Sequence, residues 1–186
     1  HQYQRQRQPN MTATVQPAHA TTLRDIVAGV PTGVFIDGTW REATSGRRFD
    51  VANPATEETL TTVADGDASD ADEAIRSAAA TQTSWARTAP AERSEILRRA
   101  HDLVVARADQ LATLMTAEMG KPIAEAHGEV AYAAGFLRWF SEEAVRIGGE
   151  PLTAPAGKPR IVVTKHPVGP CALVTPWNFP LAMGAR

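Results

Sequence analysis

Three side chains near the carboxyl end of the sequence could take part in chemistry: a thiol, an amide and a guanidinium. They belong to Cys171, Asn178 and Arg186, in the run PCALVTPWNFPLAMGAR that follows Gly169. A side-chain amide can donate a hydrogen bond to an oxyanion that forms during a reaction. The planar fork of a guanidinium matches a carboxylate with two parallel hydrogen bonds.

Each of these side chains also has a purely structural interpretation. Asn is a residue type that caps helices, and from the residues alone a cap is the favoured interpretation of Asn178. Arg186 could be a solvated surface arginine. Phe179 and Met183 lie four residues apart, on one face of a helix, where they could line a pocket or pack in a core.

Cys171 is the only cysteine, so no internal disulfide can form. It begins an apolar run, residues 171–175 (CALVT), that predicts a strand buried on both faces of a parallel sheet. A buried thiol has a raised pKa and little thiolate, so we do not expect Cys171 to be a nucleophile. The five histidines show no spacing typical of metal ligands, and no metal site is predicted. They are His1, His19, His101, His127 and His166.

The elements that precede this segment begin with short strands. Two β-prone runs, residues 34–36 and 39–41, flank Asp37-Gly38, a dipeptide that strongly predicts a two-residue hairpin turn. Residues 48–51 and 58–63 are the next predicted strands, with a turn at Asn53-Pro54 between them.

Three helices are predicted next. Ser69 and Asp72 have the spacing of a capping box at the start of the first helix, which ends near Pro90. Pro90 can open the second helix, which Gly120 ends. The third helix is predicted over residues 122–147. Its expected inward residues are Ile123, Val130, Ala134, Leu137 and Phe140.

The remaining residues predict extended structure. Residues 160–166 (RIVVTKH) are rich in β-branched side chains and could form a hairpin with residues 149–152. After the predicted strand 171–175, Pro180 can open another helix. A buried parallel strand needs neighbours that crossover connections supply. We therefore predict an incomplete α/β fold, a truncated chain in which a sheet is begun.

Composition excludes several classes of protein. The chain has 186 residues, 43% of them apolar, and a net charge of −2, which does not favour nucleic-acid binding. No window approaches a membrane span. The single cysteine fits a reducing cytoplasm, the expected location. Residues 1–20 are predicted to be a disordered leader, since HQYQRQRQPN could not pack in a core and is no secretory signal.

The segment 167–186 closely resembles the aldehyde dehydrogenase superfamily. In that family a Pro-Val-Gly turn leads into the first strand of the cofactor sheet, which Pro-Trp-Asn-Phe-Pro follows. Four upstream features agree in order and spacing: FIDGTW, the turn at residues 53–56, the break at residues 118–122 (EMGKP) and the strand 160–166. The resemblance covers roughly residues 32–186 and is greatest to NAD(P)-dependent succinate-semialdehyde dehydrogenases.

The resemblance implies an oxidoreductase with NAD or NADP as cofactor. Such enzymes oxidise an aldehyde through a thiohemiacetal and a thioester on a cysteine. By resemblance, Asn178 donates its amide N–H to the oxyanion, and Phe179, Met183 and Arg186 line the substrate site. Arg186 has the spacing of the arginine that binds the substrate carboxylate in succinate-semialdehyde dehydrogenases. The residues expected to line the cofactor pocket are Val174, Thr175, Pro176 and Trp177, which core packing alone would also explain.

The resemblance also implies the domain organisation. Residues 21–148 would be the amino-terminal part of the cofactor-binding domain, residues 149–167 an oligomerisation hairpin, and residues 168–186 the first strand and helix start of a Rossmann-like sheet. The nucleophilic cysteine and the general-base glutamate would come after Arg186, so a polypeptide of these residues alone is expected to be inactive. The complete enzyme is expected to be a dimer or tetramer.

Two other functions remain open. One is an aldehyde dehydrogenase for a different substrate, such as a general or an amino aldehyde. The other belongs to a different class: a short protein that uses its helices and the strand 160–166 as a non-catalytic interaction module, because an exposed strand edge can pair with another chain.

Overall fold

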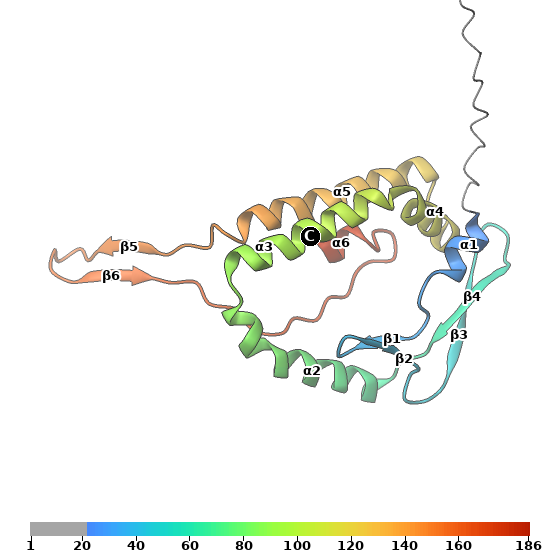
Figure 1. Ribbon diagram of the computed structural model, residues 1–186, viewed down its shortest axis with the longest axis horizontal. Coiled ribbons are helices and arrows are strands. Elements are labelled where there is room, and N and C mark those ends of the chain that lie inside the picture. The colour runs from blue at the N-terminus through green and yellow to red at the C-terminus, as the bar shows by residue number, and fades with distance from the viewer. Residues whose placement is uncertain (1–21) are drawn as a thin grey trace, which may run out of the picture.

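The computed structural model describes residues 22–186, so the predicted leader lies outside the described residues. The elements, in order, are α1 (Leu23–Ala28), β1 (Val34–Ile36), β2 (Thr39–Arg41), β3 (Arg48–Ala52), β4 (Thr59–Ala64), α2 (Ala68–Arg87), α3 (Pro90–Ala106), α4 (Ala108–Met119), α5 (Ile123–Glu143), β5 (Glu150–Thr153), β6 (Arg160–Val163) and α6 (Ala182–Ala185). The strands form three separate antiparallel pairs, and α3, α4 and α5 lie together as a helical group (Figure 1). Within residues 22–186 the structure therefore holds helices and small hairpins, and no parallel sheet.

The first amino-terminal hairpin was predicted correctly, and the second was predicted as two strands without their pairing. β1 pairs with β2 across Asp37 and Gly38, whose φ angles of 50° and 74° are those of a hairpin turn with a left-handed backbone. Phe35 and Trp40 face each other across the pair, with ring centroids 5.0 Å apart. β3 and β4 agree with the strands predicted at residues 48–51 and 58–63, and the structure pairs them in antiparallel register.

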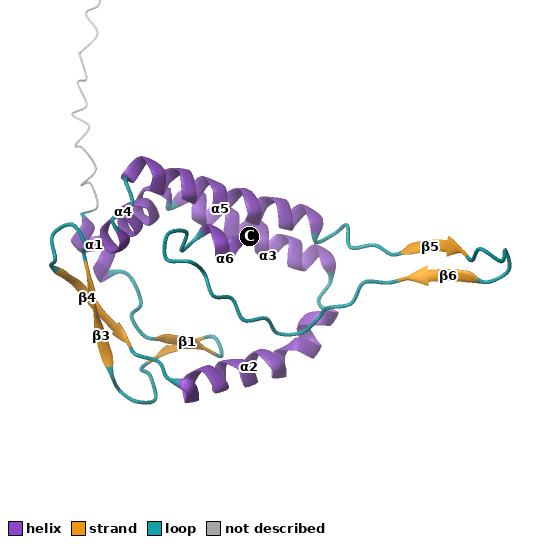
Figure 2. Ribbon diagram, turned by 180° about the vertical axis from the view of Figure 1, so that it is seen from behind, coloured by secondary structure: helices purple, strands orange, loops and turns teal. Residues whose placement is uncertain are grey.

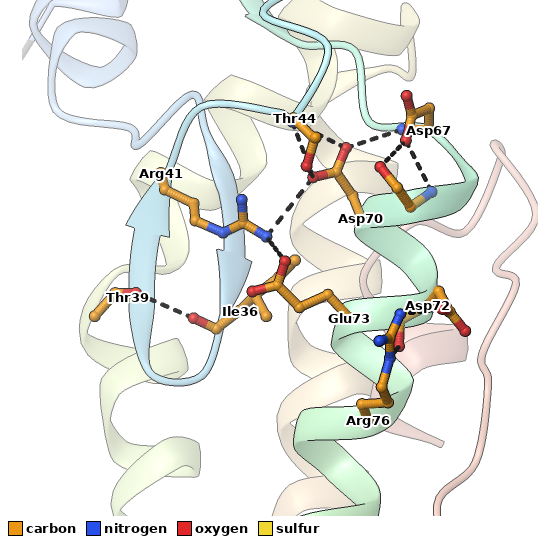
Figure 3. Close-up of polar contacts among 10 residues, drawn as sticks. Ile36, Thr39, Arg41, Thr44, Asp67, Asp70, Asp72, Glu73 and Arg76 are labelled. Atoms are coloured by element: carbon orange, nitrogen blue, oxygen red, sulfur yellow. Dashed lines mark hydrogen bonds and ion pairs between the residues drawn. The ribbon is translucent and has the colours of Figure 1, made fainter.

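Asp70 attaches the loop after β2 to the start of α2 (Figure 3). Its carboxylate accepts hydrogen bonds from the backbone N–H and the hydroxyl of Thr44, at 3.0 and 2.7 Å, and from the backbone N–H of Asp67. Arg41 lies 3.7 Å away. The capping box is therefore Asp67 with Asp70, and the predicted box two residues later was wrong. Asp67 precedes Ser69 and already accepts its N–H, while Asp72 lies further along the helix.

The predicted second helix is divided into α3 and α4 at Arg107, where φ is −110° and ψ is 18°. No glycine or proline stands at this point, so the sequence carried no signal for the break. Both helices pack against α5. Buried Ala112, Met115, Ala126 and Val130 form the core between α4 and α5.

α5 ends at Glu143, four residues before the predicted end at Ile147. Val130 and Ala134 are buried as expected, but Ile123 and Phe140 are 47% and 41% exposed. Val145 and Ile147 are 54% and 58% exposed, so the last predicted turn has little apolar burial beyond Ala144. A short helix that was not predicted, α1, begins at a capping box of Thr22 and Asp25.

The β5–β6 hairpin extends away from the helices in both views (Figures 1 and 2). Its register pairs Glu150 with Val163 and Thr153 with Arg160, and every residue of the two strands is exposed. The hairpin itself was predicted; its role in oligomerisation stays a prediction.

The predicted strand 171–175 is absent: these residues have no regular structure. Leu173 and Val174 are 72% and 97% exposed, and Cys171 is exposed, so the expected burial was wrong. A strand is held by hydrogen bonds to a neighbour, and none of the described strands pairs with this segment. α6 begins at Ala182, two residues after Pro180. None of the described helices is long and apolar enough to cross a membrane.

Candidate active site

The site is built where the end of α4 meets the turn before α6. α4 stops at Gly120, which adopts a left-handed backbone (φ 78°, ψ 10°) and donates its N–H to the carbonyl of Thr116. The turn places Lys121 immediately after the helix. The Cβ of any larger residue at position 120 would lie 3.2 Å from the ring of Pro54, so the close approach also favours glycine.

Lys121 and Glu129 form an ion pair that is almost fully buried, with side chains 8% and 1% exposed. Lys121 Nζ donates to the carboxylate of Glu129 and, at 2.6 Å, to the backbone carbonyl of Asn178. It also lies 4.3 Å from the centroid of the Phe179 ring, in cation–π contact. A cation at the end of α4 thus reaches a segment 57 residues further along the chain.

Glu129 binds the same segment through its other oxygen. Its Oε1 accepts the backbone N–H groups of Leu181 and Ala182 at 3.0 and 3.1 Å. Burial alone raises the pKa of Glu129, but the hydrogen bonds from Lys121, Ala182 and Leu181 outweigh it and hold the pKa below its usual range. Glu129 is therefore a carboxylate at neutral pH.

An open pocket of about 680 Å³ lies over this ion pair. Its walls are the end of α4, the first turns of α5 and the turn that contains Trp177, Asn178 and Phe179. The carbonyl of Asn178 is bound by Lys121, whereas its side-chain amide has no hydrogen-bond partner among the described residues. Asn178 is not the cap of α6, because that position belongs to Leu181. An amide donor at the pocket wall can serve a developing oxyanion.

The structure brings only part of the predicted site together. Trp177, Asn178 and Phe179 line the pocket, but Val174, Thr175 and Pro176 do not. Val174 and Trp177 are 97% and 77% exposed, so the expected cofactor-pocket stretch is an exposed segment in this structure.

Met183 and Arg186 also lie outside the pocket walls. Met183 follows Phe179 by one helical turn, with its N–H 3.4 Å from the Phe179 carbonyl, as the spacing of four predicted. Arg186 is exposed, and its guanidinium carbon lies 6.0 Å from the centroid of the Phe136 ring. It is thus held against α5 by a weak cation–π contact.

Sequence reasoning missed Lys121 and Glu129, because EMGKP was interpreted only as a break between helices. One signal was present: Glu129 lies between Ala126 and Ala133, at helical spacing on the buried face of α5. A carboxylate there requires a cation, since buried charges are almost always paired.

No group of side chains suited to a metal ion occurs among residues 22–186. Among residues 22–186 no base is hydrogen-bonded to Cys171: its thiol contacts the carbonyl of Gly169, at 3.6 Å.

Comparisons with known proteins agree with the resemblance in the sequence. The sequence model of the aldehyde dehydrogenase family matches residues 40–186. A succinate-semialdehyde dehydrogenase of Paenarthrobacter nicotinovorans is 64% identical over 127 residues, 68% of this chain and 28% of the relative. A 3-sulfolactaldehyde dehydrogenase of Pseudomonas putida is 44% identical over 152 residues, 82% of this chain and 31% of the relative.

Solved structures share the fold. The crystal structure of a betaine aldehyde dehydrogenase from Staphylococcus aureus, in complex with NAD+, superposes with a TM-score of 0.83 at 27% identity and covers 87% of this chain and 33% of that one. The chain thus spans about a third or less of the length of the proteins it matches. A family match over most of the sequence and a shared fold lead to one conclusion: the chain belongs to the aldehyde dehydrogenase family.

Proposed function

We propose that this protein oxidises an aldehyde that carries an anionic group, with succinate semialdehyde as the best candidate, to the carboxylic acid. The observation that supports this most is the Trp177–Asn178–Phe179 turn, which presents an unpartnered amide at a pocket wall in a chain of the aldehyde dehydrogenase family. Two similar relatives are named for anionic aldehydes, one a carboxylate and the other a sulfonate.

Asn178 is the proposed oxyanion donor. When a cysteine thiolate adds to the aldehyde, the carbonyl oxygen becomes negative, and the same happens when water attacks the thioester. A fixed amide N–H stabilises both species without reorganising at the moment of reaction. Asn178 meets this requirement because its backbone is held by Lys121 while its side chain stays free.

Arg186 is the proposed carboxylate-binding residue. A guanidinium directly after α6, one helical turn from Ala182, can bind the far end of a short substrate by a bidentate ion pair. The alternative, a solvated surface arginine, agrees with its exposure. The second candidate substrate is an aldehyde that carries a sulfonate. One relative is a 3-sulfolactaldehyde dehydrogenase, and a sulfonate also offers oxygen acceptors to a guanidinium.

The test is the full enzyme with Arg186→Ala. We expect KM for succinate semialdehyde to rise about 10- to 100-fold, because the variant loses charge-assisted hydrogen bonds to the substrate carboxylate. KM for propanal, which carries no anionic group, should stay near the wild-type value. Steady-state kinetics on both substrates measure this. Equal effects on the two aldehydes would contradict the proposed role.

The proposed cofactor is NAD or NADP, held in part by Val174, Thr175, Pro176 and Trp177. The exposed apolar surface of Val174 and Trp177 fits contact with a flat, partly apolar group. When bound, the cofactor accepts the hydride. The solved relative that holds NAD+ supports this assignment. Fluorescence quenching of Trp177 by NAD+ or NADP+, compared with a Trp177→Phe variant, would test it.

We further propose that residues 1–186 alone do not catalyse the reaction. Cys171 contacts a backbone carbonyl and no base, and the family resemblance places the nucleophile and general base after Arg186. Assay of this polypeptide with succinate semialdehyde and either cofactor should show no reduction of the cofactor. Activity that Cys171→Ser abolishes would refute this assignment.

The exposed β5–β6 hairpin is the proposed homo-oligomer contact. Its strands pair only with each other among the described elements, so their outer edges can pair with a second copy. Light scattering of the full protein with residues 150–163 replaced by a short Gly-Ser turn should show a smaller assembly. An unchanged mass would exclude the hairpin as the contact.

A further inference from the structure

The Lys121–Glu129 ion pair makes contacts that stability alone does not require. Both side chains are buried, and a buried pair is seldom more stabilising than two apolar residues of similar size. Within residues 22–186, their hydrogen bonds and cation–π contact outside the pair all go to one short segment. Lys121 binds the Asn178 carbonyl and the Phe179 ring, and Glu129 binds two backbone N–H groups beyond them.

These contacts follow the Asn178 side chain directly along the backbone. The carbonyl of Asn178 accepts a hydrogen bond from Lys121 Nζ at 2.6 Å. Three and four residues further on, the N–H groups of Leu181 and Ala182 donate to Glu129 Oε1 at 3.0 and 3.1 Å. The preceding residues 171–176 have no regular structure within the described residues 22–186.

We propose that Lys121 and Glu129 are positioning residues that hold Asn178 in the geometry its amide needs as oxyanion donor, an inference that rests on the proposed function. The ion pair acts on the backbone and does not touch the substrate. Lys121 itself is set by the left-handed Gly120 at the end of α4, and Glu129 by the buried face of α5. Two helices thus determine where a loop residue lies.

The physical reason is the accuracy that a preorganised donor demands. A catalytic group has to lie within a fraction of an ångström of its productive position, and a displacement of about 1 Å can cost about 100-fold in rate. Within residues 22–186 the neighbours of Asn178 pack loosely, since Trp177 is 77% and Phe179 is 40% exposed. Charge-assisted hydrogen bonds from buried side chains can supply this accuracy.

The decisive variant replaces both charges in the full enzyme, Lys121→Met with Glu129→Leu. An apolar pair should keep the protein folded, so the melting temperature stays close to that of the wild type. We expect kcat to fall about 10- to 100-fold, with a smaller change in KM for the aldehyde. The matched control is Arg138→Gln with Glu142→Gln, an exposed pair on α5, which should leave kcat unchanged.

The same double replacement in an Asn178→Ala background tests whether the effect passes through Asn178. We expect a further loss of less than about twofold, since the donor is already gone. Losses that multiply in this background, or a double variant that keeps the wild-type kcat, would overturn the proposal. If the ion pair had only a structural role, the folded variant with the apolar pair would have the wild-type kcat.

Glu129→Gln is the second variant, for the case that the apolar pair does not fold. It keeps the size of the side chain but replaces one carboxylate oxygen with an NH2 group. An NH2 group cannot accept the hydrogen bonds that Lys121, Leu181 and Ala182 donate to Glu129. Amide hydrogen exchange at Leu181 and Ala182 should accelerate together with a loss of kcat. Faster exchange with unchanged kcat would refute the positioning role. A wild-type enzyme that oxidises no aldehyde would instead refute the proposed function.

Discussion

Replacing Gly120 with alanine tests the geometry that delivers Lys121 to the site. At φ 78° an alanine is in the left-handed region, which costs about 1–2 kcal/mol. Its Cβ would also lie 3.2 Å from Cγ of Pro54, so the Asn53–Pro54 turn would have to move by a few tenths of an ångström. We therefore expect the free energy of unfolding to fall by about 1–2 kcal/mol or slightly more.

Gly135→Ala is the matched control with the opposite expected sign. Gly135 lies inside α5, is exposed, and has no atom within 4 Å of an added Cβ. Alanine there should stabilise the protein by about 0.5–1 kcal/mol, because glycine loses more conformational freedom in a helix. The same change of residue should thus shift stability in opposite directions at two positions of the helical group.

Urea denaturation followed by far-ultraviolet circular dichroism measures both variants. Gly120→Asn is a useful third, because asparagine tolerates the left-handed backbone and should recover part of the loss. Wild-type stability for Gly120→Ala, or destabilisation of both alanine variants to a similar extent, would refute the reasoning.

Three further changes have defined outcomes. Asp70 has a pKa below its usual range, because its carboxylate accepts hydrogen bonds from the Thr44 hydroxyl and, to a smaller extent, from backbone N–H groups. The stability that these bonds contribute is therefore present above about pH 4 and is lost as the pH falls through the lowered pKa. Asp70→Asn should flatten that part of a plot of melting temperature against pH. Met115→Ala should cost about 2–5 kcal/mol, seen in urea titration, because the side chain is 4% exposed in the core; a neutral result would mean that the core collapses around the gap. Asn178→Ala in the full enzyme should lower kcat about 100- to 1000-fold in a steady-state assay, and a wild-type kcat would remove Asn178 from the mechanism.

Local signals predicted most of the amino-terminal elements. Asp37-Gly38 forces a left-handed turn that few other dipeptides accept, and Pro90 opens α3 at the position where a missing N–H costs nothing. Helix boundaries were less accurate. The Asp67 cap competed with a similar one at Ser69, and only the contacts of Asp70 with Thr44 show which is used.

The candidate site was predicted in part for the same reason. The run of residues around Asn178 identifies the family, because it is local and distinctive. The exposure of residues 171–175 could not be predicted from their apolar character, since burial depends on which strands lie alongside.

The sequence by itself determined the family, the first hairpin, most strands and helical regions, and the identity of Asn178 and Arg186 as candidate residues. Only the tertiary structure decided that the helix breaks at Arg107 and that Lys121 and Glu129 meet Asn178. A turn or a cap depends on atoms a few bonds apart, which adjacent letters specify. A contact between residues 57 positions apart depends on how α4, α5 and the last turn pack, and no local pattern records that distance.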